Sequence, residues 1–358
     1  MPVRVHCPHC STTCQVEDRY VGATVKCGKC AKTFTARTLA PLSVPSAAAH
    51  QSPRTPTATA TDEMPLELDG PEAGANANEQ FSKTVRVPDP SSLPVGSGCL
   101  DVGVATSPGL VRTRNEDSYL THQVRWSNLD QRREAAAVVV ADGLGGHEAG
   151  DRASGLTIRT IGATLAPLFT EALADPNADL SPSRTTDTIR RAIEEANRVV
   201  YAESQKQSRW RGMGATVAAI LAVDGQAVVG HVGDCRVYHA SSERLRQVTC
   251  DQTLVARMVA LGQLSEDEAQ RHPSRNEVTH AVGRYPDLTP ELYEVKLATG
   301  DWLVAASDGL HAHVGRRELQ EALNRSPSSA LALAHHLVGL ADQGGGSDNC
   351  TVAAMRFC

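Results

Sequence analysis

Three aspartates in short glycine-containing motifs are the residues of this sequence best suited to chemistry. Asp142 lies in Ala-Asp-Gly-Leu-Gly-Gly-His, Asp308 in Ser-Asp-Gly, and Asp348 in Ser-Asp-Asn. Each adjoins a short apolar run that is typical of a β-strand. Carboxylates in such positions suit hard divalent cations, because Mg²⁺ and Mn²⁺ prefer oxygen ligands and two such ions can clamp a phosphoryl group. A carboxylate such as Asp142 could bridge both ions, and a water between them would lose a proton readily.

The motifs, taken in their order along the chain, resemble those of the metal-dependent serine/threonine protein phosphatases of the protein phosphatase 2C family, in its bacterial form. Six motifs in the expected order are far more specific than any one of them alone. The resemblance covers about residues 98–358 and is carried by the segments 109–117, 142–147, 212–216, 231–236, 307–310 and 346–349.

The resemblance assigns roles to eight residues of this sequence. It implies that two Mn²⁺ or Mg²⁺ ions are bound by Asp142, the Gly143 carbonyl, Asp308 and Asp348, with Asp234 as a ligand of a third, weaker ion. It further implies that Glu116 and Asp117 support the ions, mostly through water, and that Arg112 holds the substrate phosphate.

Several of these residues also have a structural interpretation. An Asp-Gly pair is usually a turn, as expected for Asp224-Gly225 between two apolar runs. Arg112 by itself could be a solvated surface charge. Its planar guanidinium suits bidentate phosphate binding, and its position just before residues 115–117 favours function. Asp234 fits a third-ion ligand and a structural residue in a turn equally well.

The identity of the general acid is open. The eukaryotic branch of the family has a histidine directly after its Asp-Gly, whereas this chain has Leu144, which cannot donate a proton. The leaving group must therefore be protonated by a metal-bound water or by another side chain. His147 is a candidate, although a structural histidine packed against the following helix is the favoured interpretation.

A thiol-based phosphatase mechanism is the competing chemistry. Cys350 and Arg356 have the required Cys-x5-Arg spacing. That chemistry needs a glycine-rich phosphate loop that opens a helix, whereas residues 350–357 are typical of a strand. We therefore reject the thiol mechanism on the sequence.

Four cysteines near the N-terminus predict a zinc site. Cys7-Pro-His-Cys10 is followed after 16 residues by Cys27-Gly-Lys-Cys30. Two Cys-x2-Cys knuckles can hold one tetrahedral Zn²⁺, and such a closed site is structural because the metal supplies the folding energy of a very small unit. The segment resembles the zinc ribbons at the start of many bacterial regulatory proteins. Disulfides or free thiols are the alternative, and His9 could replace one cysteine.

Composition divides the chain into three parts: a zinc ribbon at 1–38, a flexible linker at 39–97 and a catalytic domain at 98–358. Residues 39–97 hold nine of the 19 prolines and a single aromatic residue, Phe81, so they cannot bury enough apolar surface to fold. We expect a docking partner for the ribbon. Nucleic acid is an unfavourable partner because the net charge is −6.

We predict the cellular location from the absence of two signals, a membrane span and a secretory signal peptide. No apolar run approaches the length of a membrane span, and the N-terminus begins with zinc ligands rather than a secretory signal. We therefore expect a cytoplasmic protein without a membrane partner, whose ten cysteines are reduced or metal-bound.

The C-terminal part is predicted to be an α+β fold. The resemblance implies an α/β/β/α sandwich of two antiparallel sheets flanked by helices, with the metals at one end and a flap at 250–288. Strands are expected at 99–105, 135–141, 216–223, 227–232, 236–239, 292–297, 302–306 and 351–357. Helices are expected at 149–174, 183–207, 254–261, 266–271, 317–324 and 328–341, with Ser183 as the N-cap of the second.

The sequence therefore predicts a protein phosphatase that hydrolyses phosphoserine and phosphothreonine by in-line attack of a metal-activated water, without a phosphoenzyme. Its expected partners are phosphorylated proteins and the serine/threonine kinase that it opposes. One alternative is a catalytically silent phosphatase-like signalling module that docks partners through its ribbon. Another is a regulator whose main activity is docking of the ribbon to nucleic acid.

Overall fold

The computed structural model describes residues 99–127, 132–145, 149–175, 177–325 and 327–358, together with four short strands nearer the N-terminus. The chain divides into two compact units, Met1–Thr84 and Val85–Cys358. In the first unit, β1 (Pro2–His6) pairs with β2 (Thr13–Glu17), and β3 (Thr24–Lys26) pairs with β4 (Thr33–Thr35). The predicted zinc ligands Cys7, Cys10, Cys27 and Cys30 lie outside the described residues, as does His147.

The C-terminal unit is built on two antiparallel five-stranded sheets, which confirms the predicted sandwich. The first sheet has the order β12 (Glu291–Lys296), β9 (Gln226–Val232), β8 (Gly214–Val223), β7 (Arg132–Leu144) and β6 (Ser118–Ser127). The second has the order β11 (Leu245–Gln247), β10 (Arg236–Ala240), β13 (Trp302–Ala306), β14 (Cys350–Phe357) and β5 (Leu100–Ser107).

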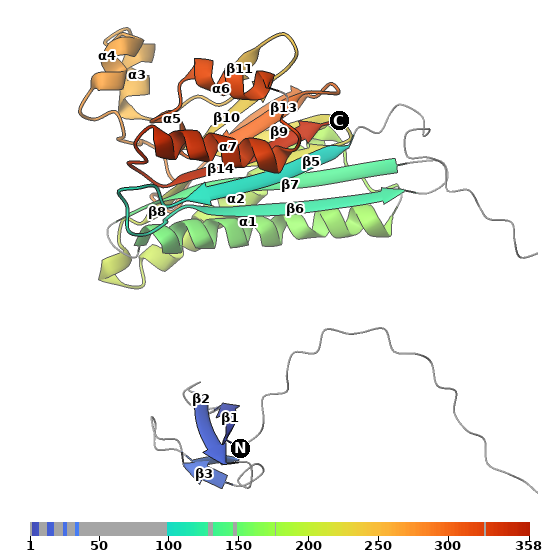
Figure 1. Cartoon of the computed structure of the whole chain (residues 1–358), viewed down its shortest axis with the longest axis vertical. Helices are drawn as coiled ribbons and strands as arrows, with labels where there is room; N and C mark the ends of the chain where they lie inside the picture. The colour runs from blue at the N-terminus through green and yellow to red at the C-terminus, as the bar shows by residue number, and fades with distance from the viewer. Residues whose placement is uncertain are drawn as a thin grey trace, which may run out of the picture. The chain divides into compact units, whose positions relative to one another are not determined.

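Helices cover the outer face of each sheet (Figure 1). The first sheet packs against α1 (Ala149–Ala174) and α2 (Pro182–Ser204), and the second against α6 (Arg316–Asn324) and α7 (Ala330–Gln343). Strand β7 contributes side chains to two apolar cores, one between its sheet and the helices and one between the two sheets. Its residues Ala137 and Val139 pack beneath the helices, while Val138 and Val140 face the other sheet. Both faces of this strand are therefore dry, which explains its nearly continuous apolar sequence.

The helix expected from residue 183 begins one residue earlier, with a different cap. The N-cap of α2 is Ser181, whose Oγ accepts a hydrogen bond from the backbone N–H of Arg184 at 3.4 Å. Pro182 occupies the first helical turn, where its missing N–H costs nothing. The prediction of Ser183 as the N-cap was wrong because it took Pro182 to precede the helix.

Besides the four strands of the first unit, four elements of the C-terminal unit were not expected from the sequence: β6, the 3₁₀ helix η3 (Ser208–Trp210), β11 and α5 (Asp308–His311). Strand β6 is an edge strand with only one neighbour, and its polar and apolar residues are mixed because it is only partly covered. The segment predicted as a flap carries the expected helices α3 (Leu254–Ala260) and α4 (Glu266–Arg271). Within the described ranges, no helix combines the length and the apolar character needed to span a bilayer.

The close approach of β5 to α7 makes Gly103 a test of this packing. A Cβ at Gly103 would lie 2.1 Å from the backbone nitrogen of Leu331. We expect Gly103→Ala to destabilise the unit by about 1–3 kcal/mol, or to lower Tm by roughly 3–10 °C. Gly339→Ala is the matched control, because the added methyl group on α7 meets no atom within 4 Å outside its own stretch of helix. In thermal melts the control should be neutral or slightly stabilising. Equal effects at both positions would contradict this account.

Candidate active site

Strands β6 and β7 bring two carboxylates together at one end of the first sheet. Asp142 is part of β7. The antiparallel register pairs Ser118 of β6 with Ala141, so Asp117, just before β6, comes beside Asp142. On the other side, Asp142 pairs with Thr216 of β8. The adjacent Gly143 is packed so tightly that a Cβ there would lie 2.1 Å from the Gly150 carbonyl oxygen.

The second sheet contributes Asp308 and Asp348 to the same end. Asp308 opens α5 directly after β13, and Asp348 lies two residues before β14. Ser307 ties this sheet to the first one. Its hydroxyl donates to Asp117 Oδ2 at 2.8 Å and accepts from the Thr351 N–H at 2.9 Å. Asp308 lies close enough to Asp142 for its charge to raise the pKa of that carboxyl. The structure therefore brings together three carboxylates that are far apart in the sequence.

Burial and mutual repulsion raise the pKa values of these carboxyl groups. Burial, with the charge of Asp308 and Asp348, raises the pKa of Asp117 to about 7, although hydrogen bonds from Thr351 and Ser307 oppose the shift. Burial and the charge of Asp348 raise the pKa of Asp308 to about 6. The pKa of Asp142 is raised well above its ordinary value by burial and by the charges of Asp117 and Asp308. Negative charge is thus concentrated where little water can screen it.

Asp234 belongs electrostatically to this cluster. It is buried in the turn between β9 and β10. Burial, followed by the charge of Asp308, raises its pKa to about 7, while a hydrogen bond from Thr216 opposes the shift. This turn is attached to the base of the predicted flap through Gln252. The Gln252 N–H donates to the Gly233 carbonyl at 2.8 Å, and its Oε1 accepts from the Gly233 N–H at 2.9 Å.

Arg112 and Glu116 lie on the loop between β5 and β6. Arg112 Nη2 is 2.7 Å from Asp348 Oδ2, and about half of the Arg112 side chain is exposed. The guanidinium is therefore fixed at the edge of the carboxylate cluster and remains accessible to a ligand. Burial raises the pKa of Glu116, while the nearby charge of Arg112 opposes the shift.

Asn349 positions this loop, a role that its motif gave no reason to predict. Its Oδ1 accepts from the Glu116 N–H at 2.8 Å. Its Nδ2 donates to the carbonyl oxygens of Pro108 at 2.9 Å and Arg114 at 2.8 Å. One amide side chain therefore fastens both ends of the loop that carries Arg112. The only sequence signal was its position directly after Asp348.

The donor set fits a hard divalent cation. It consists of oxygen atoms, and the buried Asp117 Oδ1 has no hydrogen-bond partner. Among the described residues, no three acidic, histidine or cysteine side chains already surround one point in the arrangement of an ion site. Asp348 is turned toward Arg112 and Asp117 toward Ser307. Binding an ion would therefore require these side chains to exchange their present partners for the cation.

The structure supports the rejection of a thiol mechanism. Cys350 and Arg356 both lie on β14, where six residues of extended chain span roughly 20 Å. Cys350 is 1% exposed, and burial raises the pKa of its thiol far above the ordinary value. A buried, protonated sulfur far from its arginine cannot attack a bound phosphate.

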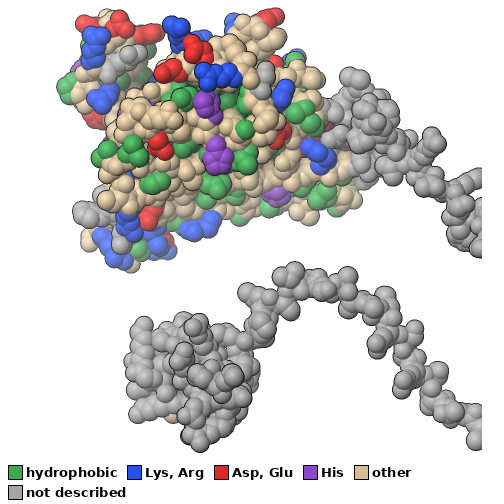
Figure 2. Space-filling model, in the orientation of Figure 1, with side chains coloured by type: hydrophobic (Ala, Val, Ile, Leu, Met, Phe, Trp, Pro, Cys, Tyr) green, Lys and Arg blue, Asp and Glu red, His purple; other side chains and the backbone are tan. Residues whose placement is uncertain are grey.

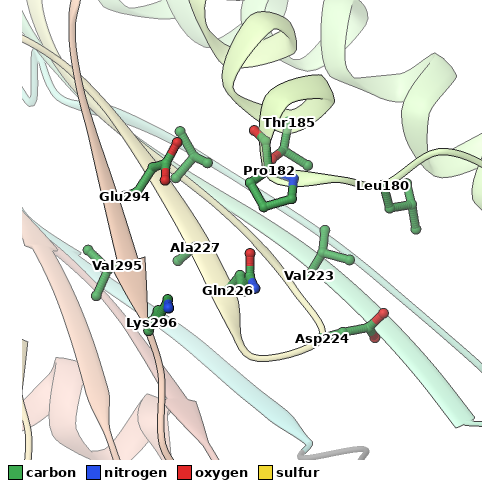
Figure 3. A pocket seen from close by; sticks show the side chains of 11 residues that line it. Leu180, Pro182, Thr185, Val223, Asp224, Gln226, Ala227, Glu294, Val295 and Lys296 are labelled. Atoms are coloured by element: carbon green, nitrogen blue, oxygen red, sulfur yellow. The ribbon is translucent and has the colours of Figure 1, made fainter.

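One pocket of the C-terminal unit is remote from the carboxylates. It has a volume of about 490 Å³ and is lined by residues of the β8–β9 hairpin, β12 and the start of α2, among them Asp224, Thr185 and Lys296 (Figure 3). Asp224 and Asp142 lie at opposite ends of the β7–β8 pair, because Ala135 pairs with Val223 at one end and Leu144 with Gly214 at the other. The pocket is therefore separate from the candidate active site.

Comparisons with known proteins identify the family. The protein phosphatase 2C family model matches residues 112–339. The chain is 31% identical to protein phosphatase PhpP of Streptococcus pneumoniae over 261 residues, which are 72% of this chain and 98% of PhpP. The crystal structure of the Mycobacterium tuberculosis serine/threonine phosphatase PstP/Ppp aligns with a TM-score of 0.59 at 31% identity, covering 72% of this chain and 98% of that one.

A structure of the catalytic domain of serine/threonine protein phosphatase PstP in complex with two manganese ions aligns with a TM-score of 0.58 at 30% identity. The alignment covers 72% of this chain and 97% of that chain. The chain belongs to the protein phosphatase 2C family.

The raised pKa values predict how pH and a divalent cation affect stability. A carboxyl group whose pKa rises from about 4 in the unfolded chain to about 6–7 stabilises the fold when protonated. This contribution is complete below about pH 4 and is lost as pH rises through 6–7. Without divalent cations, Tm should therefore fall between pH 5.5 and 8, and the increase caused by Mn²⁺ should grow over the same range.

The measurement is a series of thermal melts at constant ionic strength, with Asp308→Asn as the comparison. This variant removes one titrating group, so the fall in Tm with pH and the effect of Mn²⁺ should both be smaller. Identical pH profiles for the wild type and the variant would show that Asp308 does not contribute to the charge cluster.

Proposed function

We propose that this protein is a metal-dependent protein serine/threonine phosphatase. The observation that carries the proposal is the meeting of Asp117, Asp142 and Asp308 from two sheets, with Arg112 held beside them by Asp348. The family membership and the names of the relatives support it. The expected substrates are proteins that carry phosphoserine or phosphothreonine, produced by a serine/threonine kinase that this enzyme opposes.

We assign the metal ions of the proposed enzyme to the carboxylates of the candidate active site. Two Mn²⁺ or Mg²⁺ ions would be held by Asp142, the Gly143 carbonyl, Asp308 and Asp348, with Asp234 on a third ion and Glu116 and Asp117 in support. When bound, such ions supply a readily deprotonated water and neutralise the charge on a phosphoryl group.

Side chains of the protein position the substrate phosphate and balance its charge. The Arg112 guanidinium is exposed on one side and can pair with two non-bridging phosphate oxygens. Its bond to Asp348 fixes the guanidinium within reach of the cluster. Leu144 follows Gly143 at the end of β7 and has no proton to donate. The proton for the leaving hydroxyl must therefore come from water or from another side chain.

A catalytically silent module that only binds phosphoproteins is the second candidate. Four carboxyl groups with raised pKa values disfavour it, because a binding surface gains nothing from buried like charges. Docking to nucleic acid is disfavoured by the net charge of −6. Acidic and basic side chains are also intermixed on the face of the C-terminal unit shown in Figure 2.

The N-terminal residues are proposed to form a zinc ribbon joined by a linker. The two Cys-x2-Cys motifs fall in the connections 7–12 and 27–32, between the paired strands β1–β2 and β3–β4. Hairpin connections are where paired cysteines of a zinc knuckle are expected. One Zn²⁺ on Cys7, Cys10, Cys27 and Cys30 would stabilise a unit too small for a substantial core. The ribbon would then serve to dock a partner, and the cytoplasmic location stays a prediction.

Metal-dependent hydrolysis of a phosphothreonine peptide tests the proposed function. Turnover should require Mn²⁺ or Mg²⁺ and stop in excess chelator. Asp142→Asn should abolish turnover while the unit stays folded, because it removes a charge from the centre of the cluster. Asp224→Asn is the matched control, since Asp224 also precedes a glycine but occupies the β8–β9 hairpin turn. Full activity in excess chelator, or equal activity of the two variants, would refute the proposal.

Removing the N-terminal residues tests whether residues 98–358 catalyse hydrolysis without the proposed zinc ribbon. Residues 98–358 alone should hydrolyse a small aryl phosphate at about the rate of the full chain, because all six motifs lie within that stretch. Metal analysis should find one tightly bound zinc in the full chain and none after removal of residues 1–38. Loss of hydrolysis on deletion would show instead that the N-terminal residues help to build the active site.

A further inference from the structure

A pair of cysteines extends the ladder between β5 and β14 by one residue pair. Leu100 pairs with Phe357 at the end of this ladder. Beyond that pair, the Cys99 N–H donates to the Cys358 carbonyl at 2.9 Å, and the Cys358 N–H donates to the Cys99 carbonyl at 2.7 Å. Both cysteines carry free thiols.

The backbone already has the separation that a disulfide needs. Residues that exchange both backbone hydrogen bonds in an antiparallel pair have Cα atoms about 5.5 Å apart. Disulfides span Cα separations of about 4.4–6.8 Å. The neighbouring residues are also held in place. The Leu100 N–H donates to Glu134 Oε2 at 2.9 Å, and the Phe357 N–H donates to the Asp301 carbonyl at 2.9 Å. The Cα separation of this pair is therefore within the range that a disulfide spans.

We propose that Cys99 and Cys358 are a redox modification site that closes into a reversible disulfide on exposure to a small-molecule disulfide such as oxidised glutathione. Cys358 is exposed and Cys99 is half-buried, so the Cys358 thiolate attacks first. Its sulfur bonds to one glutathione sulfur and the other glutathione leaves as a thiolate. The Cys99 thiolate then attacks the Cys358 sulfur and releases the second glutathione. The two cysteine protons end on the two glutathione thiols, so one disulfide is reduced as the other forms.

The environment makes this reaction slow at neutral pH. Burial, together with the neighbouring Cys99, raises the pKa of the Cys358 thiol to about 11. Only a small fraction is then the reactive thiolate, so the pair remains reduced in a reducing compartment and responds to sustained oxidation.

The consequence of closure follows from the position of β5 in its sheet. Strand β5 is an edge strand whose one neighbour in the sheet is β14. Its far end, Ser107, pairs with Cys350 and leads into the loop that carries Arg112. A disulfide at Cys99 and Cys358 would hold the opposite end of this ladder closed. It should stabilise the unit against separation of β5 and leave the carboxylate cluster undisturbed.

The test uses the full-length protein, incubated with oxidised or reduced glutathione in the absence of a chelator. After alkylation of free thiols and digestion with trypsin, oxidation should join the peptide of residues 87–112 to Phe357-Cys358. The oxidised protein should melt about 5 °C higher than the reduced one. Its rate of aryl phosphate hydrolysis at 25 °C should be unchanged, and dithiothreitol should reverse the shift in Tm.

Matched variants separate this pair from the other thiols. Cys99→Ser and Cys358→Ser should each abolish the linked peptide and the shift in Tm, whereas Cys250→Ser, which removes another exposed thiol, should retain both. The proposal is overturned if both cysteines stay alkylatable after oxidation or if either joins a different cysteine. It is equally overturned if the linked protein melts at the temperature of the reduced one.

Discussion

Repulsion among buried carboxylates is the constraint on which the architecture of the C-terminal unit depends. Asp117, Asp142, Asp234 and Asp308 all have raised pKa values, because burial and neighbouring negative charge both disfavour ionisation. Such groups separate unless the surrounding structure holds them. The same repulsion favours binding of a cation. A bound divalent cation would displace the protons from these carboxyl groups and offset their negative charge.

Rigid strands on both sides of the cluster supply that restraint. Strand β8 is buried along its whole length, and the strands beside it are fixed in register by continuous pairing. The two sheets are joined at the site by hydrogen bonds rather than by apolar packing alone. Ser307 bonds to Asp117 across the sheets, and Asn349 fastens the loop that bears Arg112. The apolar core therefore stabilises the fold, and these few polar contacts determine where the charged groups lie.

The two ends of the sandwich have different properties. One end carries the buried carboxylates, Arg112 and the β9–β10 turn, which is attached through Gln252 to the segment predicted as a flap. The other carries the pocket beside Asp224 and the Cys99–Cys358 pair. Strands β5 and β14 run between these ends, and eight residue pairs of their ladder separate the cysteine pair from the loop that carries Arg112. This separation is why stability and hydrolysis should respond independently to oxidation.

The sequence by itself determined the fold class, most of the strands and helices, and the family. Long apolar runs such as 135–141 identify strands because a strand covered on both faces must be apolar throughout. Elements with mixed composition, such as β6, escaped detection because an edge strand has one exposed side. The motifs also singled out Asp142, Asp308 and Asp348, whose chemistry depends on residue type and local glycine content.

Only the tertiary structure decided which groups meet. The position of Asp117 beside Asp142 depends on the register of β6 and β7, because a shift of one residue would send the side chain to the other face. The contacts of Ser307 with Asp117 and of Asn349 with Glu116 each join residues about 190 positions or more apart in the chain. The raised pKa values have the same origin, because burial and neighbouring charge exist only once the two sheets have packed together.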